Sequence, residues 1–198
     1  RVIQDLNLTN EQFMERVERM GSVLRHSAFD GLLYGYPPMS GLEPEAWFQG
    51  PFDPGACLVV AELSGEAPGA QPPAEYLLVS MSKRMQDTLP PGSFCHVMSE
   101  RHIVALVPNA KALQDGTLAD LFEQMRRWTG QGAKMAVSRP FFRLSDMTDA
   151  FWQAREALAG LDEGIRRAET PRDEAEPFTF AQLQRLYHGL LAGAPVAP

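Results

Sequence analysis

Apolar residues along the chain recur with two spacings, and each spacing predicts one type of element. Apolar side chains three or four positions apart predict helices over residues 74–89, 117–129 and 145–161. Continuous apolar runs rich in β-branched and aromatic residues predict strands over residues 56–63, 94–98, 103–107 and 134–138. The resulting order, β-α-β-β-α-β-α, is typical of a ferredoxin-like α+β fold with an added helix. In that fold an antiparallel sheet carries helices on one face.

A seam of apolar residues marks the helix that precedes this core. Thr9 and Gln12 form an N-terminal capping box. The helix that follows has apolar residues in a 4-3-4 spacing, at Phe13, Val17, Met20 and Leu24. This spacing predicts that two copies of the helix meet in a homodimer. Near the other end of the chain, Thr179 and Gln182 form a second capping box and begin a C-terminal helix.

Changes in composition divide the chain into five predicted parts. Proline and glycine interrupt one segment, and charged residues fill another, so both are predicted to be connectors. The parts are an N-terminal helix (residues 1–35), a Pro/Gly-rich connector (36–55), the α+β domain (56–161), a charged linker (162–177) and a C-terminal helix with a tail (178–198).

Composition limits the classes of function. The chain is 44% hydrophobic, which is enough for one core. No apolar run reaches the roughly 18 residues that cross a bilayer, so we expect a cytoplasmic protein without membrane contact. The net charge of −7 disfavours a nucleic-acid surface, because phosphates are bound by clustered Lys and Arg. The chain starts at Arg1, and we expect it to be a piece of a longer protein.

The predicted hairpin, FCHVMSERHIVALV over residues 94–107, contains one cysteine, two histidines and a glutamate. Adjacent strand residues point to opposite faces, so Cys95 and His96 cannot both bind one metal ion. Cys95 and the other cysteine, Cys57, both lie in apolar runs and are expected to be reduced core residues. We therefore expect a structural hairpin without metal or cofactor, in which His102 could titrate near neutrality.

The segment AVSRPFFRLSDMTDAFWQAREAL at residues 136–158 follows a known family pattern. It resembles the degenerate GGDEF-like domain of the PucR and CdaR families of bacterial transcriptional regulators. FDGLLYG at residues 29–35 and FTFAQLQRLYHGLL at residues 178–191 resemble the family's segments before and after the domain. The matching positions in the first segment are Leu144, Met147, Ala150, Phe151, Gln153, Ala154, Arg155, Ala157 and Leu158.

This resemblance implies a non-catalytic regulatory and dimerisation module. Such regulators carry a helix-turn-helix after the GGDEF-like domain, and this chain stops before one, so DNA contact is implied only through that absent domain. Active GGDEF cyclases place two glycines and an acidic pair at the hairpin turn, with a second metal carboxylate at the end of the first strand. Here the turn is Ser99-Glu100-Arg101 and Glu62 lies near the strand end, so we expect no enzyme activity.

Two alternatives stay open. The first is a metabolite-sensing domain with a pocket between the sheet and the Pro-rich connector, because four aromatic residues gather there. These candidate ligand or partner contacts are Tyr34, Tyr36, Trp47 and Phe48. The second alternative is an active GTP-dependent nucleotide cyclase that uses Glu62 and Glu100. No residue pattern identifies an effector.

Overall fold

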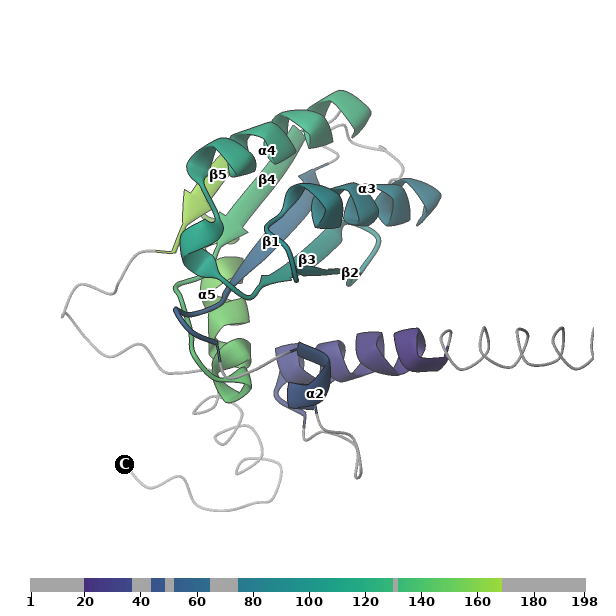
Figure 1. Ribbon diagram of the computed structural model, residues 1–198. Coiled ribbons are helices and arrows are strands. Elements are labelled where there is room, and N and C mark those ends of the chain that lie inside the picture. Colours follow the sequence, from purple (N-terminus) through teal and green to yellow (C-terminus); the bar gives the residue numbers. More distant parts are fainter. Residues whose placement is uncertain (1–19, 37–43, 49–51, 65–74, 130–131, 169–198) are drawn as a thin grey trace, which may run out of the picture.

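The structure is a computed structural model, and it describes residues 20–36, 44–48, 52–64, 75–129 and 132–168 (Figure 1). Five strands form one sheet in the order β2-β3-β1-β4-β5. Their bounds are β1 Cys57–Ser64, β2 Phe94–Val97, β3 His102–Val107, β4 Gly132–Val137 and β5 Gly164–Arg167.

Helices follow the strands as the apolar spacing predicts. The first helix covers residues 20–34 in its described part, and it is called the first helix below. The other helices are α2 Pro44–Phe48, α3 Glu75–Thr88, α4 Asp115–Thr129 and α5 Met147–Ala159, with short 3-10 turns at Ala110–Ala112 and Leu144–Asp146. The helix predicted from residue 117 thus begins two residues earlier. In the described ranges, no helix combines the length and the apolar composition that a bilayer crossing requires.

The strand pairing confirms the predicted α+β fold. β1 lies at the centre and pairs antiparallel with β3 and β4, so that Val60 faces Val104 on one side and Ala136 on the other. β2 pairs antiparallel with β3 and completes the hairpin. The four strands β1 to β4, with α3 and α4 between them, form the expected βαββαβ unit.

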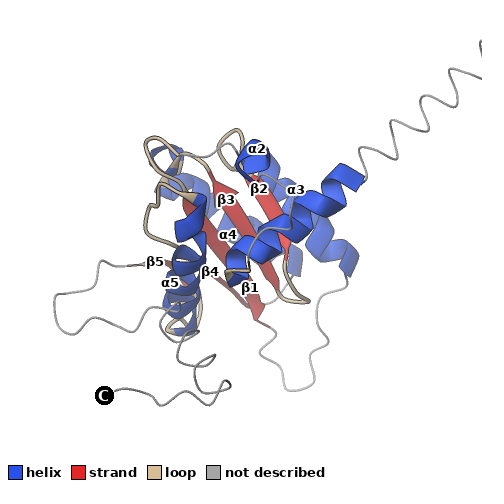
Figure 2. Cartoon of the chain, turned by 90° about the horizontal axis from the view of Figure 1, so that it is seen from below, coloured by secondary structure: helices blue, strands red, loops and turns tan. Residues whose placement is uncertain are grey.

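Both faces of the sheet are covered, which explains the uninterrupted apolar run of β1. Helices α3 and α4 cover one face, as predicted, and the first helix, α2 and α5 cover the other (Figures 1 and 2). The prediction of helices on one face therefore holds for α3 and α4, and further helices cover the other face as well. The β1 residues that face α3 and α4 are Cys57, Val59, Ala61 and Leu63, and those that face the other layer are Leu58 and Val60.

The fifth strand lies inside the segment that was predicted to be a charged linker. β5 pairs parallel to β4 after the crossover through α5. Its charged residues are used to hold it: Arg167 contacts Asp115 Oδ1 at 2.8 Å and the carbonyl oxygen of Leu113 at 3.2 Å. Glu163, just before the strand, contacts Arg126 Nε at 3.1 Å. Residues 164–167 thus belong to the sheet. The sequence suggested that their charged neighbours are solvated, but Glu163 and Arg167 contact Arg126 and Asp115 of α4.

Two predicted helical segments lie partly or wholly outside the described residues. Residues 1–19 of the N-terminal helix and the whole C-terminal helix (178–198) lie outside the described residues, so the predictions for these residues stay untested. Inside the predicted Pro/Gly-rich connector (36–55), the structure places the short helix α2. The cysteines agree with the expectation, since Cys57 and Cys95 are both buried and free.

Candidate functional site

The hairpin turn between β2 and β3 is closed by one serine. Ser99 Oγ lies 2.8 Å from His102 Nδ1 and accepts a weaker hydrogen bond from the backbone N–H of Arg101 at 3.4 Å. The backbone N–H of Met98 donates to the carbonyl of His102 at 2.9 Å. Side-chain contacts of this kind rigidify a turn in which no glycine is present.

Glu62 faces the hairpin from the neighbouring strand. It is the register partner of His102, and His102 Nε2 lies 3.6 Å from Glu62 Oε2. Burial lowers the pKa of His102, Arg155 and Arg101 lower it further, and Glu62 acts in the opposite direction. The Glu62 carboxylate therefore has an imidazole as its partner. Within the described ranges, no three His, Cys, Asp or Glu side chains are grouped so that they could hold a metal ion.

The hairpin cysteine and histidine point to opposite faces, as the strand period requires. Cys95 packs in the core beneath α3 and α4, and burial, with a smaller effect of Asp87, raises the pKa of its thiol to about 12. Burial likewise raises the pKa of Cys57 to about 12. Thiols with such values remain protonated and unreactive at neutral pH.

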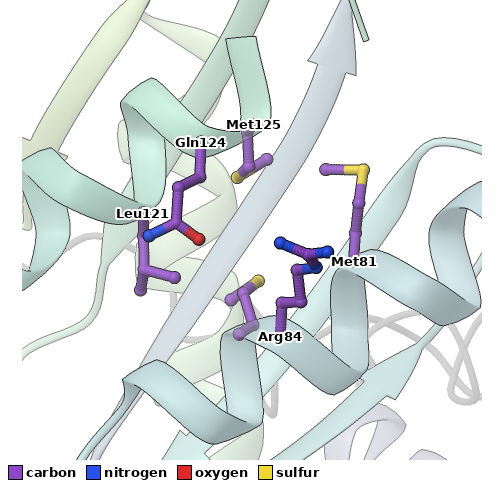
Figure 3. Close-up of a pocket in the computed structure, with 6 residues that line it drawn as sticks. Met81, Arg84, Leu121, Gln124 and Met125 are labelled. Atoms are coloured by element: carbon purple, nitrogen blue, oxygen red, sulfur yellow. The ribbon is translucent and has the colours of Figure 1, made fainter. Parts of the chain in front are cut away.

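The crevice between α3 and α4 is nearly filled by apolar side chains. Figure 3 shows Arg84 of α3 and Gln124 of α4 reaching toward each other across it, above methionine and leucine side chains. The remaining space is about 10 Å³, which is about the room for one water molecule. In this conformation the crevice has no room for a metabolite.

The other face of the sheet carries an unexpected contact between the first helix and β2. His26 Nδ1 lies 2.9 Å from His96 Nδ1, and His96 Nε2 lies 2.8 Å from Asp30 Oδ1. The guanidinium of Arg25 lies over the ring of Phe94 at 4.3 Å. Arg25 and His26 are adjacent and Asp30 lies one turn after His26, so one side of the helix brings all three to the hairpin. We call these contacts the helix-hairpin contact.

Aromatic rings form the apolar part of the helix-hairpin contact. Phe29 is fully buried and lies edge-on to Phe94, with ring centroids 5.1 Å apart. Phe48 of α2 completes the cluster at 5.4 Å from Phe94 and 5.5 Å from Phe29. Edge-to-face pairs at these distances are favourable beyond the area they bury. The first helix is therefore anchored both by packing and by polar contacts.

The electrostatics of this contact favour a neutral His26. Burial lowers the pKa of His26, and the nearby His96 and Arg25 lower it further, while Asp30 acts in the opposite direction. Burial also lowers the pKa of Arg25. A proton on His26 would therefore place a second positive charge beside Arg25 in a partly buried position.

A cleft of about 370 Å³ lies beside the helix-hairpin contact. It is formed by the first helix, α2, the last turn of α3 and the start of β2. Its lining residues are Arg25, Trp47, Phe48, Gln86, Asp87, Gly92, Ser93, Phe94 and Leu106. The volume lies in the range of small-molecule sites in proteins, which is about 300–1,000 Å³.

The four aromatic candidates divide into two groups. Trp47 and Phe48 line the cleft, although Phe48 is also a core residue with 3% of its surface exposed. Tyr34 packs instead on Phe151 of α5, with ring centroids 5.9 Å apart, and it contacts Tyr36 at 6.3 Å. Tyr36 is 62% exposed. The structure thus does not bring the two tyrosines into the lining of this cleft.

The predicted dimer seam is visible only in part. Phe13 and Val17 lie outside the described residues. Met20 is 62% exposed and Leu24 is 37% exposed, and Val23 beside them is 67% exposed. Apolar side chains are therefore exposed on the described part of the seam, and the dimer stays a prediction.

Sequence reasoning did not find the residues of the helix-hairpin contact. His26 and His96 are 70 positions apart, and each histidine alone has no motif. The one local signal is the spacing of His26 and Asp30, which places both on one helix face. Pairing that face with the hairpin requires the fold.

A family model and a solved structure are similar to parts of this chain. No curated protein matches the chain. A solved structure that it resembles is the active GGEEF domain of a diguanylate cyclase from Vibrio cholerae, with 12% sequence identity and a TM-score of 0.41 over 59% of this chain and 84% of that chain. The family model of the GGDEF-like domain matches residues 48–159, from the end of α2 to the end of α5. Since this match covers more than half of the sequence, the chain belongs to the GGDEF-like domain family.

Proposed function

We propose that this chain is a non-catalytic regulatory and dimerisation module of a cytoplasmic, PucR/CdaR-like transcriptional regulator. DNA binding belongs, in this proposal, to a separate helix-turn-helix domain. The proposal rests on the family membership together with the sequence resemblance in residues 136–158. The observation that carries it is the first helix, which is anchored on one side and apolar on its exposed side.

An anchored helix with an exposed apolar side suits a subunit contact. Phe29 and the polar contacts of His26 fix one side of the helix to the sheet. On the exposed side, Met20 and Val23 are each more than half exposed. Covering exposed apolar groups of this kind with a second copy of the chain makes the free energy of association more favourable. A movement of the first helix at the dimer contact would then also move the anchored side of the helix against the sheet.

Features of the hairpin support the non-catalytic part of the proposal. Phosphoryl transfer depends on a close backbone approach to phosphates and on carboxylates that hold Mg²⁺. The turn has Ser99, Glu100 and Arg101 where a glycine would permit that approach. Glu62 faces His102, and the crevice between α3 and α4 is filled.

Light scattering after size-exclusion chromatography tests the dimer. We expect the wild-type chain to have the mass of two chains, and the double variant Val17→Glu, Met20→Glu to have the mass of one, because buried charges without partners disfavour association. The double variant Ala119→Glu, Ala159→Glu adds the same two charges at exposed positions of α4 and α5 and is the control. An unchanged mass in the double variant contradicts the proposed contact.

A second candidate function is the sensing of a small molecule. The cleft of about 370 Å³ favours it, because Trp47 and Phe48, which the sequence marks as candidates, both line that cleft. A ligand bound there would contact the first helix and the hairpin at once. Any ligand that binds the folded state raises the midpoint of thermal unfolding, so a thermal-shift screen separates this candidate from a purely structural cleft.

A further inference from the structure

Two opposite charges face the cleft without pairing with each other. Arg25 of the first helix and Asp87 of α3 both line it. Within the part of the chain that the structure describes, neither forms an ion pair. The Nε atom of Arg25 is buried without a hydrogen-bond acceptor there. Buried donors are rarely left without an acceptor, so the described residues do not use the full hydrogen-bonding capacity of Arg25.

The Arg25 side of the cleft suits an anionic group. The guanidinium lies 4.3 Å above Phe94 and 5.3 Å from the centre of Phe48, and these two rings hold its position. A guanidinium that is held in place binds a carboxylate through two parallel hydrogen bonds. The low polarity of the two rings strengthens that pairing.

The Asp87 side suits a cationic group. Asp87 lies in the last turn of α3, and that turn carries no basic residue. The C-terminal end of a helix has a partial negative charge, so the carboxylate and the helix end both favour a cation at this point. Gln86 and Ser93 are nearby polar groups in the lining. The Ser93 hydroxyl donates to the carbonyl of Pro90 at 2.6 Å, which leaves its oxygen free to accept.

We propose that the cleft binds a small zwitterion of the α-amino-acid type with an apolar side chain. Its carboxylate pairs with Arg25, its ammonium pairs with Asp87, and its side chain contacts Trp47. A purely anionic ligand would be repelled by Asp87, and a purely cationic ligand would be repelled by Arg25. This inference rests on the second candidate function, and it names the chemical class of the ligand.

The first test measures which ligand charges are required. The whole chain is screened with the protein amino acids by thermal shift, and affinities are then measured by calorimetry. L-phenylalanine is compared with 3-phenylpropanoate, which lacks the ammonium, and with 2-phenylethylamine, which lacks the carboxylate. We expect at least one apolar amino acid to raise the unfolding midpoint, and each single-charge analogue to bind about tenfold more weakly.

The second test removes the two protein charges. Arg25→Met keeps an apolar stem on the two rings, and Asp87→Asn keeps the shape of the side chain. We expect the affinity to fall about tenfold in Arg25→Met and about threefold in Asp87→Asn, since Asp87 is exposed. Arg127→Met and Asp120→Asn change the same charges at exposed positions of α4 and should bind as the wild type does.

The outcomes separate this inference from the sensing function. If no amino acid raises the midpoint, or if Asp87→Asn and Arg25→Met both bind as the wild type does, the zwitterion site is wrong. Asp87 is on the surface, so its variant folds even where Arg25→Met does not, and the test stays decisive. If a ligand of another class binds and Trp47→Ala abolishes that binding, sensing is retained and the zwitterion is overturned. Neither result changes the dimer test, which is made without ligand.

Discussion

His26 Nδ1 lies 2.9 Å from His96 Nδ1, so two imidazoles that are 70 residues apart in the sequence lie within hydrogen-bond distance of each other. One ring must donate and the other must accept, which requires at least one of the two to be neutral. Asp30 Oδ1 lies 2.8 Å from His96 Nε2, so the carboxylate can accept a hydrogen bond from that nitrogen and orient the His96 ring. The hydrogen bond between the two rings is therefore lost when both rings are protonated, while the aromatic packing around Phe29 and Phe94 does not depend on it.

The first prediction follows from the pKa of His26, which lies below its usual value in the folded state. A lowered folded pKa means that the unfolded state binds the proton more tightly. The stability from neutral His26 is thus present above the unfolded pKa of about 6.5 and is lost as the pH falls through the folded pKa. We expect urea unfolding to show a lower stability at about pH 5 than at about pH 7.5.

The His26→Gln variant checks this assignment. Glutamine keeps a side-chain donor at the position and removes the titration, so the variant should lose less stability between the two pH values than the wild type does. His102, whose pKa is also lowered, contributes separately, and His102→Gln measures that part. A pH dependence that is unchanged in His26→Gln would show that the titration of His26 does not control the packing of the first helix on the sheet.

A second prediction concerns the aromatic cluster. Phe94 is buried and contacts Phe29, Phe48 and Arg25. We expect Phe94→Ala to lower the free energy of unfolding by about 3–5 kcal/mol, because it leaves a cavity and removes ring contacts. Phe142→Ala is the matched control, since Phe142 is 57% exposed, and it should change stability by about 0.5 kcal/mol or less. Equal effects of the two substitutions would contradict the cluster.

A third prediction concerns β5. Arg167 joins the strand to Asp115 and to the carbonyl of Leu113. We expect Arg167→Met to lower stability by only about 0.5–1 kcal/mol, since the side chain is about half exposed. The local effect should be larger, with faster hydrogen exchange at the amide of Ala168, which donates to Val137. Arg127→Met leaves β5 untouched and should not change that exchange.

A fourth prediction separates the proposed module from an active cyclase. We expect the chain with Mg²⁺ and GTP to form no product above a no-protein control, because the turn lacks the glycine that a close phosphate approach requires. If Mg²⁺-dependent turnover is found and is lost in Glu62→Ala and Glu100→Ala, the non-catalytic proposal fails. Glu156→Ala, at an exposed position of α5, is the control for those variants.

The sequence predicts what local side-chain patterns determine. The run from Cys57 to Ser64 and the hairpin over residues 94–107 are recognisable because buried strands need apolar side chains. β5 is missed because Arg166 and Arg167 look like residues of a solvated linker, and the Asp115 that binds Arg167 is 52 positions away. Non-local pairing of this kind leaves no local pattern.

The candidate site is predicted less well than the fold. Trp47 and Phe48 are found because aromatic residues in a connector must pack on something. Arg25 and Asp87 are missed because each looks like an ordinary charged residue of a helix surface. Only their approach to one cleft gives them a shared role, and that approach depends on how the first helix lies on the sheet.

The strand order places β2 and β5 at opposite edges of the sheet. Four strand spacings separate them, which is about 19 Å at the usual spacing of about 4.8 Å. The first helix contacts β2 through His96, and it also contacts α5 within the same layer, where Thr148 donates to the carbonyl of Leu32 at 2.7 Å. The first helix is thus held at two points, one at β2 and one at α5. A rotation of the first helix about its contact with β2 would displace its contact with α5. A small tilt of the helix near β2 therefore shifts the helix sideways relative to α5.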